Sequence, residues 1–99
     1  MQSLTAKQKR FLRARAHNMK PVVTLGNAGL TTAVMDEIAS SIEHHELMKI
    51  KLGALDKDAK TALLQQICDQ TKSQVVYLIG HVATIYRAAQ KPQIQLPKD

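Results

Sequence analysis

Aromatic side chains are scarce in this 99-residue chain. It has no tryptophan, and its only phenyl and phenol rings belong to Phe11, Tyr77 and Tyr86. Surfaces that bind unpaired nucleic-acid bases commonly stack them on several exposed rings. Three rings supply such a surface poorly, and we expect all three to lie in the hydrophobic core.

Cysteine and long apolar runs are also lacking. The single Cys68 excludes an intrachain disulfide and fits a reducing compartment, so we expect a cytoplasmic protein in which this thiol is a buried small hydrophobe. The apolar run at residues 75–79 is far shorter than the ~20 residues of a membrane-spanning helix. The basic N-terminus is not followed by the apolar segment of a secretory signal. We therefore expect neither a membrane span nor a secretory signal.

Acidic residues are absent before Asp36, whereas residues 1–35 carry six basic ones. The remaining eight basic and eight acidic residues balance, so the whole net charge of +6 belongs to the N-terminal third. Such asymmetry indicates a surface for a polyanion, with nucleic acid as the first candidate and an anionic membrane as the second. A solvated helix face that only aids solubility is the competing interpretation.

Capping signals and periodicity predict three helices, over about residues 5–18, 31–45 and 56–72. Thr5 followed by Gln8 forms a capping-box pattern at the start of the first helix. Short β-branched and alternating runs predict four strands. The strands are expected at residues 22–25, 47–52, 75–79 and 82–87.

The resulting order α-β-α-β-α-β-β predicts an α/β fold: a two-layer sandwich with a mixed four-stranded sheet. The β-α-β crossovers favour parallel pairing, and the hairpin at Gly80-His81 makes the last two strands antiparallel. We expect one domain over residues 1–99, with about residues 88–99 forming a C-terminal tail.

Basic residues of the first helix form a stripe. At 100° per residue, Lys9, Arg10, Arg13 and His17 lie within a sector of about 100°, and Leu4, Gln8, Phe11, Leu12 and Arg15 share another face. On the second strand, Lys49 and Lys51 could extend the basic surface. Surface lysines are also routine on half-buried strands, so Lys49 and Lys51 are either part of the basic surface or ordinary strand lysines.

The segment Gly26-Asn27-Ala28-Gly29 lies between the first strand and the second helix. Glycines allow close approach of the backbone, and the helix N-terminus offers free N–H groups to an anion, although an ordinary strand-to-helix turn has the same pattern. The glycine patterns of mononucleotide and dinucleotide sites are missing, which disfavours those chemistries. A loop that clamps the sugar-phosphate backbone, as in KH domains, is the nucleic-acid alternative.

Sites for metals and catalysis are poorly supported. His44-His45-Glu46 could bind a metal or transfer protons, but a closed zinc site needs four ligands, which one cysteine and this spacing do not suggest. No nucleophile and base occur at a recognisable spacing. We expect a binding module that is not an enzyme, with no metal, cofactor or small-molecule substrate and a monomer as the default.

Six short segments spread along nearly the whole chain form a pattern more specific than the two glycines. They are Leu4-Thr5-Ala6-Lys7-Gln8, Ala16-His17, Lys20-Pro21-Val22-Val23, Gly26-Asn27-Ala28-Gly29-Leu30-Thr31, His45-Glu46-Leu47 and Ile85-Tyr86-Arg87. This pattern resembles the CRM domain family (chloroplast RNA splicing and ribosome maturation), particularly its short bacterial YhbY-like members. The acid-poor, Arg-containing N-terminus is also typical of an organelle transit peptide, but the resemblance places the first helix inside the domain, which argues against that interpretation.

The resemblance implies a fold similar to the C-terminal domain of translation initiation factor three, RNA binding, and association with precursors of the large ribosomal subunit. It maps the family's GxxG loop onto residues 26–29 and its basic helix surface onto the stripe. The loop departs from many family members because Asn27-Ala28 carries no charge, which leaves more of the binding to backbone N–H groups.

Together, the residues and the resemblance predict an RNA-binding surface. Its expected members are Lys9, Arg10, Arg13, His17, Lys20, Gly26, Asn27, Ala28, Gly29, Thr31, Lys49 and Lys51. The expected partner is ribosomal RNA in large-subunit precursors. The alternative is a protein-binding adaptor whose basic helix contacts an acidic partner.

Overall fold

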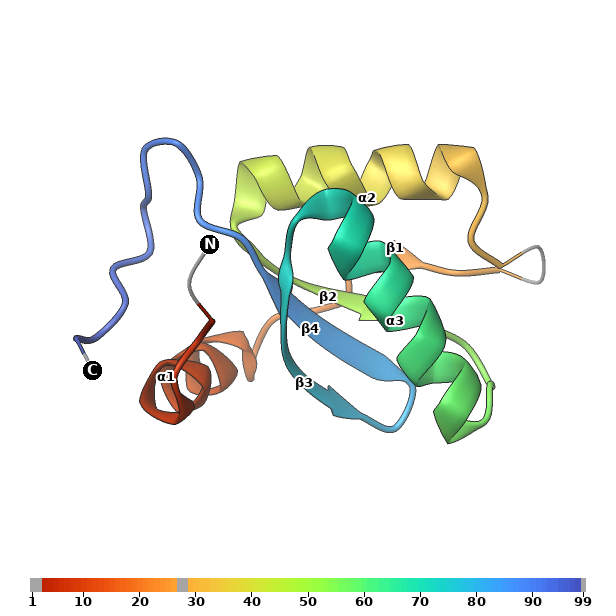
Figure 1. Ribbon diagram of the computed structural model, residues 1–99, viewed down its shortest axis with the longest axis horizontal. Helices are drawn as coiled ribbons and strands as arrows, with labels where there is room; N and C mark the ends of the chain where they lie inside the picture. The colour runs from red at the N-terminus through yellow and green to blue at the C-terminus, as the bar shows by residue number, and fades with distance from the viewer. Residues whose placement is uncertain (1–2, 27–28, 99) are drawn as a thin grey trace.

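The computed structural model describes residues 3–26 and 29–98, so Asn27 and Ala28 of the predicted loop lie outside the described residues. The chain forms the predicted order α-β-α-β-α-β-β (Figure 1). The elements are α1 (Ala6–Ala16), β1 (Val23–Thr24), α2 (Thr32–His45), β2 (Leu47–Lys51), α3 (Lys57–Thr71), β3 (Gln74–Ile79) and β4 (Val82–Tyr86).

Side-chain caps fix where the three helices begin. Thr5 and Gln8 form the predicted capping box, in which each side chain accepts a hydrogen bond from the other residue's backbone N–H at 3.1 Å. The hydroxyl of Thr31 caps α2, and the carboxylate of Asp56 caps α3, each accepting from the N–H three residues further on. Asp56 is therefore the N-cap residue of α3, and Asp58 lies in its first turn.

The four strands form one mixed sheet in the order β1-β2-β4-β3. β1 pairs with β2 in parallel, whereas β4 is antiparallel to both of its neighbours. The crossover through α3 therefore leaves β3 parallel to β2, but with β4 inserted between them. The mixed sheet, the parallel crossovers and the antiparallel hairpin agree with the sequence prediction.

Alternation along β2 separates the core into two apolar clusters. Met48 and Ile50 face α2 and α3 in the larger cluster, whereas Leu47 faces a second cluster that includes Leu12 and Ala16 of α1. Because successive strand residues point to opposite faces, α1 lies on the far side of the sheet from α2 and α3. Figure 1 shows α1 below the sheet and α2 above it. The predicted two-layer sandwich thus gains a partial third layer.

A buried carboxylate holds the C-terminal segment, residues 87–98, against the domain. Glu46 follows α2 with a φ of +66° and is 3% exposed. Its Oε1 accepts hydrogen bonds from the N–H groups of Gln93 (2.7 Å) and Ile94 (3.2 Å), and its Oε2 accepts from Ala89 (3.1 Å). Bonds from several N–H groups to one ionised carboxylate are stronger than neutral ones. Glu46 therefore works as an anchor for this segment.

The anchored segment supports α1. Ile94 is buried in the same cluster as Leu12, and the Gln8 side chain donates to the carbonyl oxygen of Pro97 at 3.2 Å. Residues 87–98 contain no helix or strand, yet they complete the apolar surface on which α1 lies. Burial, together with the nearby Glu46 carboxylate, raises the pKa of the Tyr86 phenol beneath them.

The helices also bear on the expectation about membranes. Within residues 3–26 and 29–98, none of the three is both long enough and apolar enough to cross a bilayer.

Candidate nucleic-acid interface

The predicted basic stripe lies on the exposed side of α1. Lys9, Arg10, Arg13 and His17 are all exposed, and their spacing of three or four residues places them along one side of the helix. A hollow of about 510 Å³ runs beside the last turns of α1. It is lined by Arg10, Arg13, Ala14, His17 and Asn18. An anion that enters this hollow meets four donor side chains.

The opposite side of α1 is packed against the sheet. Leu12 and Ala16 are fully buried, and Phe11 is half-buried. The face predicted to contain Arg15 has Ala16 in the core instead, and Arg15 is exposed. A small residue in the last turn lets α1 lie close to the sheet. The stripe is consequently carried by a helix whose orientation is fixed by packing.

Arg13 is held in place by an aromatic ring. Its guanidinium carbon lies 4.7 Å from the ring centroid of Tyr77 on β3, the geometry of a cation–π contact. Tyr77 is half-buried, and Phe11 is too, so the expectation of three core rings holds fully only for Tyr86, which is 4% exposed. Sequence reasoning missed the pairing of Arg13 with Tyr77 because the two residues are far apart along the chain.

Lys49 and Lys51 lie on the same face of the sheet as α1. They alternate with buried Ile50, and Leu47 on their side of β2 packs in the α1 cluster. The Nζ of Lys49 donates to the carbonyl oxygen of His17, at the end of α1, over 3.4 Å. Lys51 is exposed. Both lysines therefore belong to the surface that begins with the stripe.

The flanks of the GxxG loop are formed by two glycines in different conformations. Gly29 has a φ of +71°, and its N–H donates to the carbonyl oxygen of Gly26 at 3.0 Å. A Cβ at either glycine would meet nothing within 4 Å, so the positive φ, and not crowding, is what favours glycine at position 29. Thr31 uses its hydroxyl oxygen to cap α2. The loop thus leads directly into a capped helix N-terminus.

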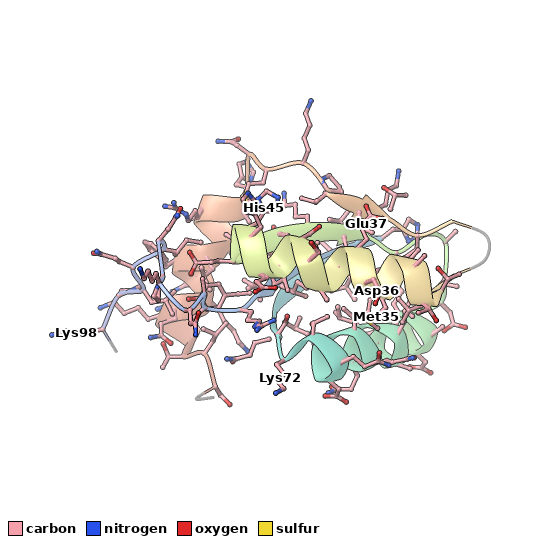
Figure 2. The ribbon with its side chains drawn as sticks, turned by 90° about the horizontal axis from the view of Figure 1, so that it is seen from above. Met35, Asp36, Glu37, His45, Lys72 and Lys98 are labelled. Carbon is pink, nitrogen blue, oxygen red and sulfur yellow. The ribbon has the colours of Figure 1, made fainter. Side chains whose placement is uncertain are left out.

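The stripe and the GxxG loop do not lie side by side. Both views place α1 at one end of the long axis and the start of α2 near the other end (Figures 1 and 2). β2 connects them, because Lys49 contacts His17 and the carbonyl of Lys51 accepts from the N–H of Leu25, one residue before the loop. Lys20 is exposed in the link between α1 and β1. The predicted residues that the structure describes form an extended surface and not a single pocket.

Charge is segregated between the two faces of the sheet. Acidic residues within the described ranges lie on α2, on α3 or at their caps, and Figure 2 shows two of them, Asp36 and Glu37, on α2. The α1 side carries eight exposed or half-buried basic residues, and the described acid whose contacts reach this side, Glu46, is only 3% exposed. These basic residues are Lys7, Lys9, Arg10, Arg13, Arg15, Lys20, Lys49 and Lys51. A polyanion is therefore attracted to one face only.

The other candidates for chemistry are placed apart from this surface. Cys68 is buried beside α2 and the sheet, and burial, helped by the charge of Asp69, raises the pKa of its thiol to about 11. His44 and His45 are exposed at the end of α2, with their ring centroids 4.9 Å apart. Over residues 3–26 and 29–98, no three His, Cys, Asp or Glu side chains gather as metal ligands would.

Comparison with known proteins places this arrangement in a family. The sequence model of the CRS1 / YhbY (CRM) domain family matches residues 4–87. A Haemophilus influenzae protein named RNA-binding protein is 42% identical over 98 residues, which cover 99% of each chain. A Pseudomonas aeruginosa protein, named a probable RNA-binding protein, is 37% identical over 94 residues, covering 95% of this chain and 90% of its own.

A solved structure shares the fold as well. The solution structure of a hypothetical Staphylococcus aureus protein, proposed to bind RNA, superposes with a TM-score of 0.83 at 34% sequence identity. The match covers 96% of this chain and 100% of the other. The family pattern spans every helix and strand of the fold described above, from α1 to β4. The chain therefore belongs to the CRS1/YhbY (CRM) domain family.

Proposed function

We propose that this chain is a non-catalytic, cytoplasmic RNA-binding protein that binds ribosomal RNA in precursors of the large ribosomal subunit and assists their assembly. The observation that carries the proposal is the segregation of charge, with eight basic residues on the α1 side of the sheet, where the described acid is the buried Glu46. Neutralising phosphates with lysine and arginine is the main source of affinity for nucleic acid. The names of the Haemophilus and Pseudomonas relatives are consistent with it.

In this proposal each part of the surface has a role. The stripe of Lys9, Arg10, Arg13 and His17 binds phosphates of a folded RNA and supplies affinity that does not depend on sequence. The GxxG loop approaches the sugar-phosphate backbone at the other end of the molecule, through backbone N–H groups because its central residues are uncharged. Lys49 and Lys51 continue the phosphate contacts between them.

Arg13 is a donor of the stripe that contacts an aromatic ring. The Tyr77 ring restricts its guanidinium, so less side-chain entropy is lost when a phosphate binds. A guanidinium can also bind two phosphate oxygens at once, which an ammonium group cannot. Arg13 is consequently expected to contribute more to affinity than the neighbouring Lys9.

Sedimentation of the native complex, with and without nuclease, tests the proposal. Tagged protein in a cell extract is expected to sediment with large-subunit precursors on a sucrose gradient and to be released when the RNA is digested. Crosslinking and sequencing of the bound RNA should then return large-subunit sequences. If the protein stays on a particle or complex after complete digestion, it is held by protein contacts, and the acidic-partner adaptor replaces the RNA-binding proposal.

A further inference from the structure

Part of the α1 face of the sheet extends beyond α1 and is partly exposed, although Thr84 within it is buried, at 1% exposed. α1 packs over the row of Leu47 and Tyr86, and the strands extend beyond it by two further cross-strand rows. The strand register gives the members of these rows. The first row is Tyr77, Thr84, Lys49 and Val22, and the second is Ile79, Val82, Lys51 and Thr24. A β-bulge at Val76 turns Tyr77 and Ile79 to this face.

These rows have an apolar half and a basic half. On β3 and β4, Ile79 is 56% exposed and adjoins half-buried Val82 and Tyr77. Beside them on β2 are the two lysines. A hollow of about 220 Å³ crosses the boundary between the halves. It is lined by Pro21, Lys49, Tyr77, Ile79, Val82 and Thr84.

The charge of this open face matches the stripe. The two rows include two lysines and no acid, and every member is a described residue. Arg13 lies over Tyr77 at the border, so a ligand can pass from the stripe onto the sheet without meeting a negative charge. An apolar surface rimmed by lysine and arginine suits a ligand that has flat apolar groups along an anionic chain.

From this juxtaposition we propose that the open face binds a short unpaired segment of RNA next to the folded region held by the stripe. Bases or riboses of the segment lie on Tyr77, Ile79 and Val82, and its phosphates lie along Lys49 and Lys51. The proposal rests on the proposed function and adds the kind of RNA recognised. A closed duplex stacks its bases inside, so it would gain nothing from an exposed isoleucine. The Tyr77 ring and the Arg13 guanidinium provide the flat surfaces that a several-ring platform would otherwise supply.

Two RNAs and two variants separate this contact from general phosphate binding. The RNAs are a closed hairpin and the same hairpin with a five-nucleotide bulge. Ile79→Ser removes the apolar contact without changing charge, and Leu55→Ser is the matched control, because Leu55 is 40% exposed and lies outside both rows. Wild-type protein should prefer the bulged RNA at least about fivefold, the lower end of the effect of one stacked base.

Ile79→Ser should lose this preference while its affinity for the closed hairpin stays unchanged, and Leu55→Ser should keep both. Melting curves of the variants check that they are folded. A second measurement uses 4-thiouridine in the bulge, which should crosslink to the tryptic peptide of residues 73–87.

Equal wild-type affinity for the two RNAs would overturn the proposed contact while RNA binding through the stripe stands. The proposed contact would also be overturned if Ile79→Ser kept the preference for the bulged RNA, or if crosslinks formed only with other peptides. The open face would then be a candidate surface for a protein partner. If wild-type protein binds neither RNA at any salt concentration, the proposed function fails together with this inference.

Discussion

Replacing Lys9, Arg10 and Arg13 by glutamine is expected to flatten the salt dependence of RNA binding. All three side chains are exposed on the stripe, so each can neutralise one phosphate. A phosphate contact contributes about 0.7 to 0.9 to the slope of log K against log salt, and three lost contacts reduce the slope by about 2 to 3. When the salt concentration falls from 1 M to 0.1 M, the affinity of the variant therefore rises about 100- to 500-fold less than that of the wild type.

The same triple variant should remain folded. Exposed substitutions such as those of Lys9 and Arg10 usually change the free energy of unfolding by less than about 0.5 kcal/mol. The loss of the Arg13 contact with Tyr77 costs about 0.5 to 1 kcal/mol, as for a cation–π pair at an exposed site. For a domain of this size, that predicts a melting temperature about 2 to 8 °C below the wild type.

Fluorescence anisotropy with a labelled hairpin, titrated at several salt concentrations, measures the slope directly. The control variant carries Lys57→Gln, Lys72→Gln and Lys91→Gln, which remove the same three charges from exposed positions on α3, at its cap and in the C-terminal segment. The control should keep most of the wild-type slope. If both variants flatten it equally, net charge and not the stripe determines binding; an unchanged slope in the stripe variant would show that its residues are merely solvated.

Three further predictions follow from the anchor, the loop and the thiol. Glu46→Gln should lower the free energy of unfolding by about 1 to 3 kcal/mol in a thermal melt, because an amide cannot accept all three N–H bonds. The control Glu43→Gln, at an exposed position, should change the free energy of unfolding by less than about 0.5 kcal/mol. Equal losses in the two variants would contradict the role of Glu46 as an anchor. Asn27→Asp with Ala28→Asp should lower RNA affinity at least about tenfold without unfolding the protein, and wild-type affinity would remove the loop from the interface. Cys68, with a pKa of about 11, should react with iodoacetamide at pH 8 only after unfolding, so rapid labelling of the native protein would refute its burial.

The helices could be predicted from sequence because their signals are local. The capping box at Thr5 and the i, i+4 spacing that follows Thr31 need no information from the rest of the chain. The sheet order could not be predicted in the same way. β4 lies between β2 and β3 because of pairing between distant segments, and the side of the sheet chosen by α1 depends on the same pairing. Periodicity identifies a strand but not its neighbours.

The candidate site divides along the same line. The exposure of Lys9 and Arg13 could be predicted from the helical period, because that period alone places the stripe residues on one side of the helix. The turn of Tyr77 toward Arg13 depends on the β-bulge, for which the alternating run at residues 75–79 gives no sign. Glu46 finds its partners 43 to 48 residues away. Its one local trace is an acid at a helix C-terminus, where the helix dipole disfavours it.

The second apolar cluster unites the two ends of the chain, and this determines the order in which the domain can assemble. Leu12 of α1 is buried with Val76, Tyr86 and Ile94, all more than 60 residues later in the sequence. On a growing chain α1 is therefore synthesised well before the partners that complete its cluster. Contacts between such distant residues form slowly, and the unit they close can open without disturbing the larger cluster under α2 and α3. The surface that carries the stripe is accordingly complete only once the C-terminal segment has joined it.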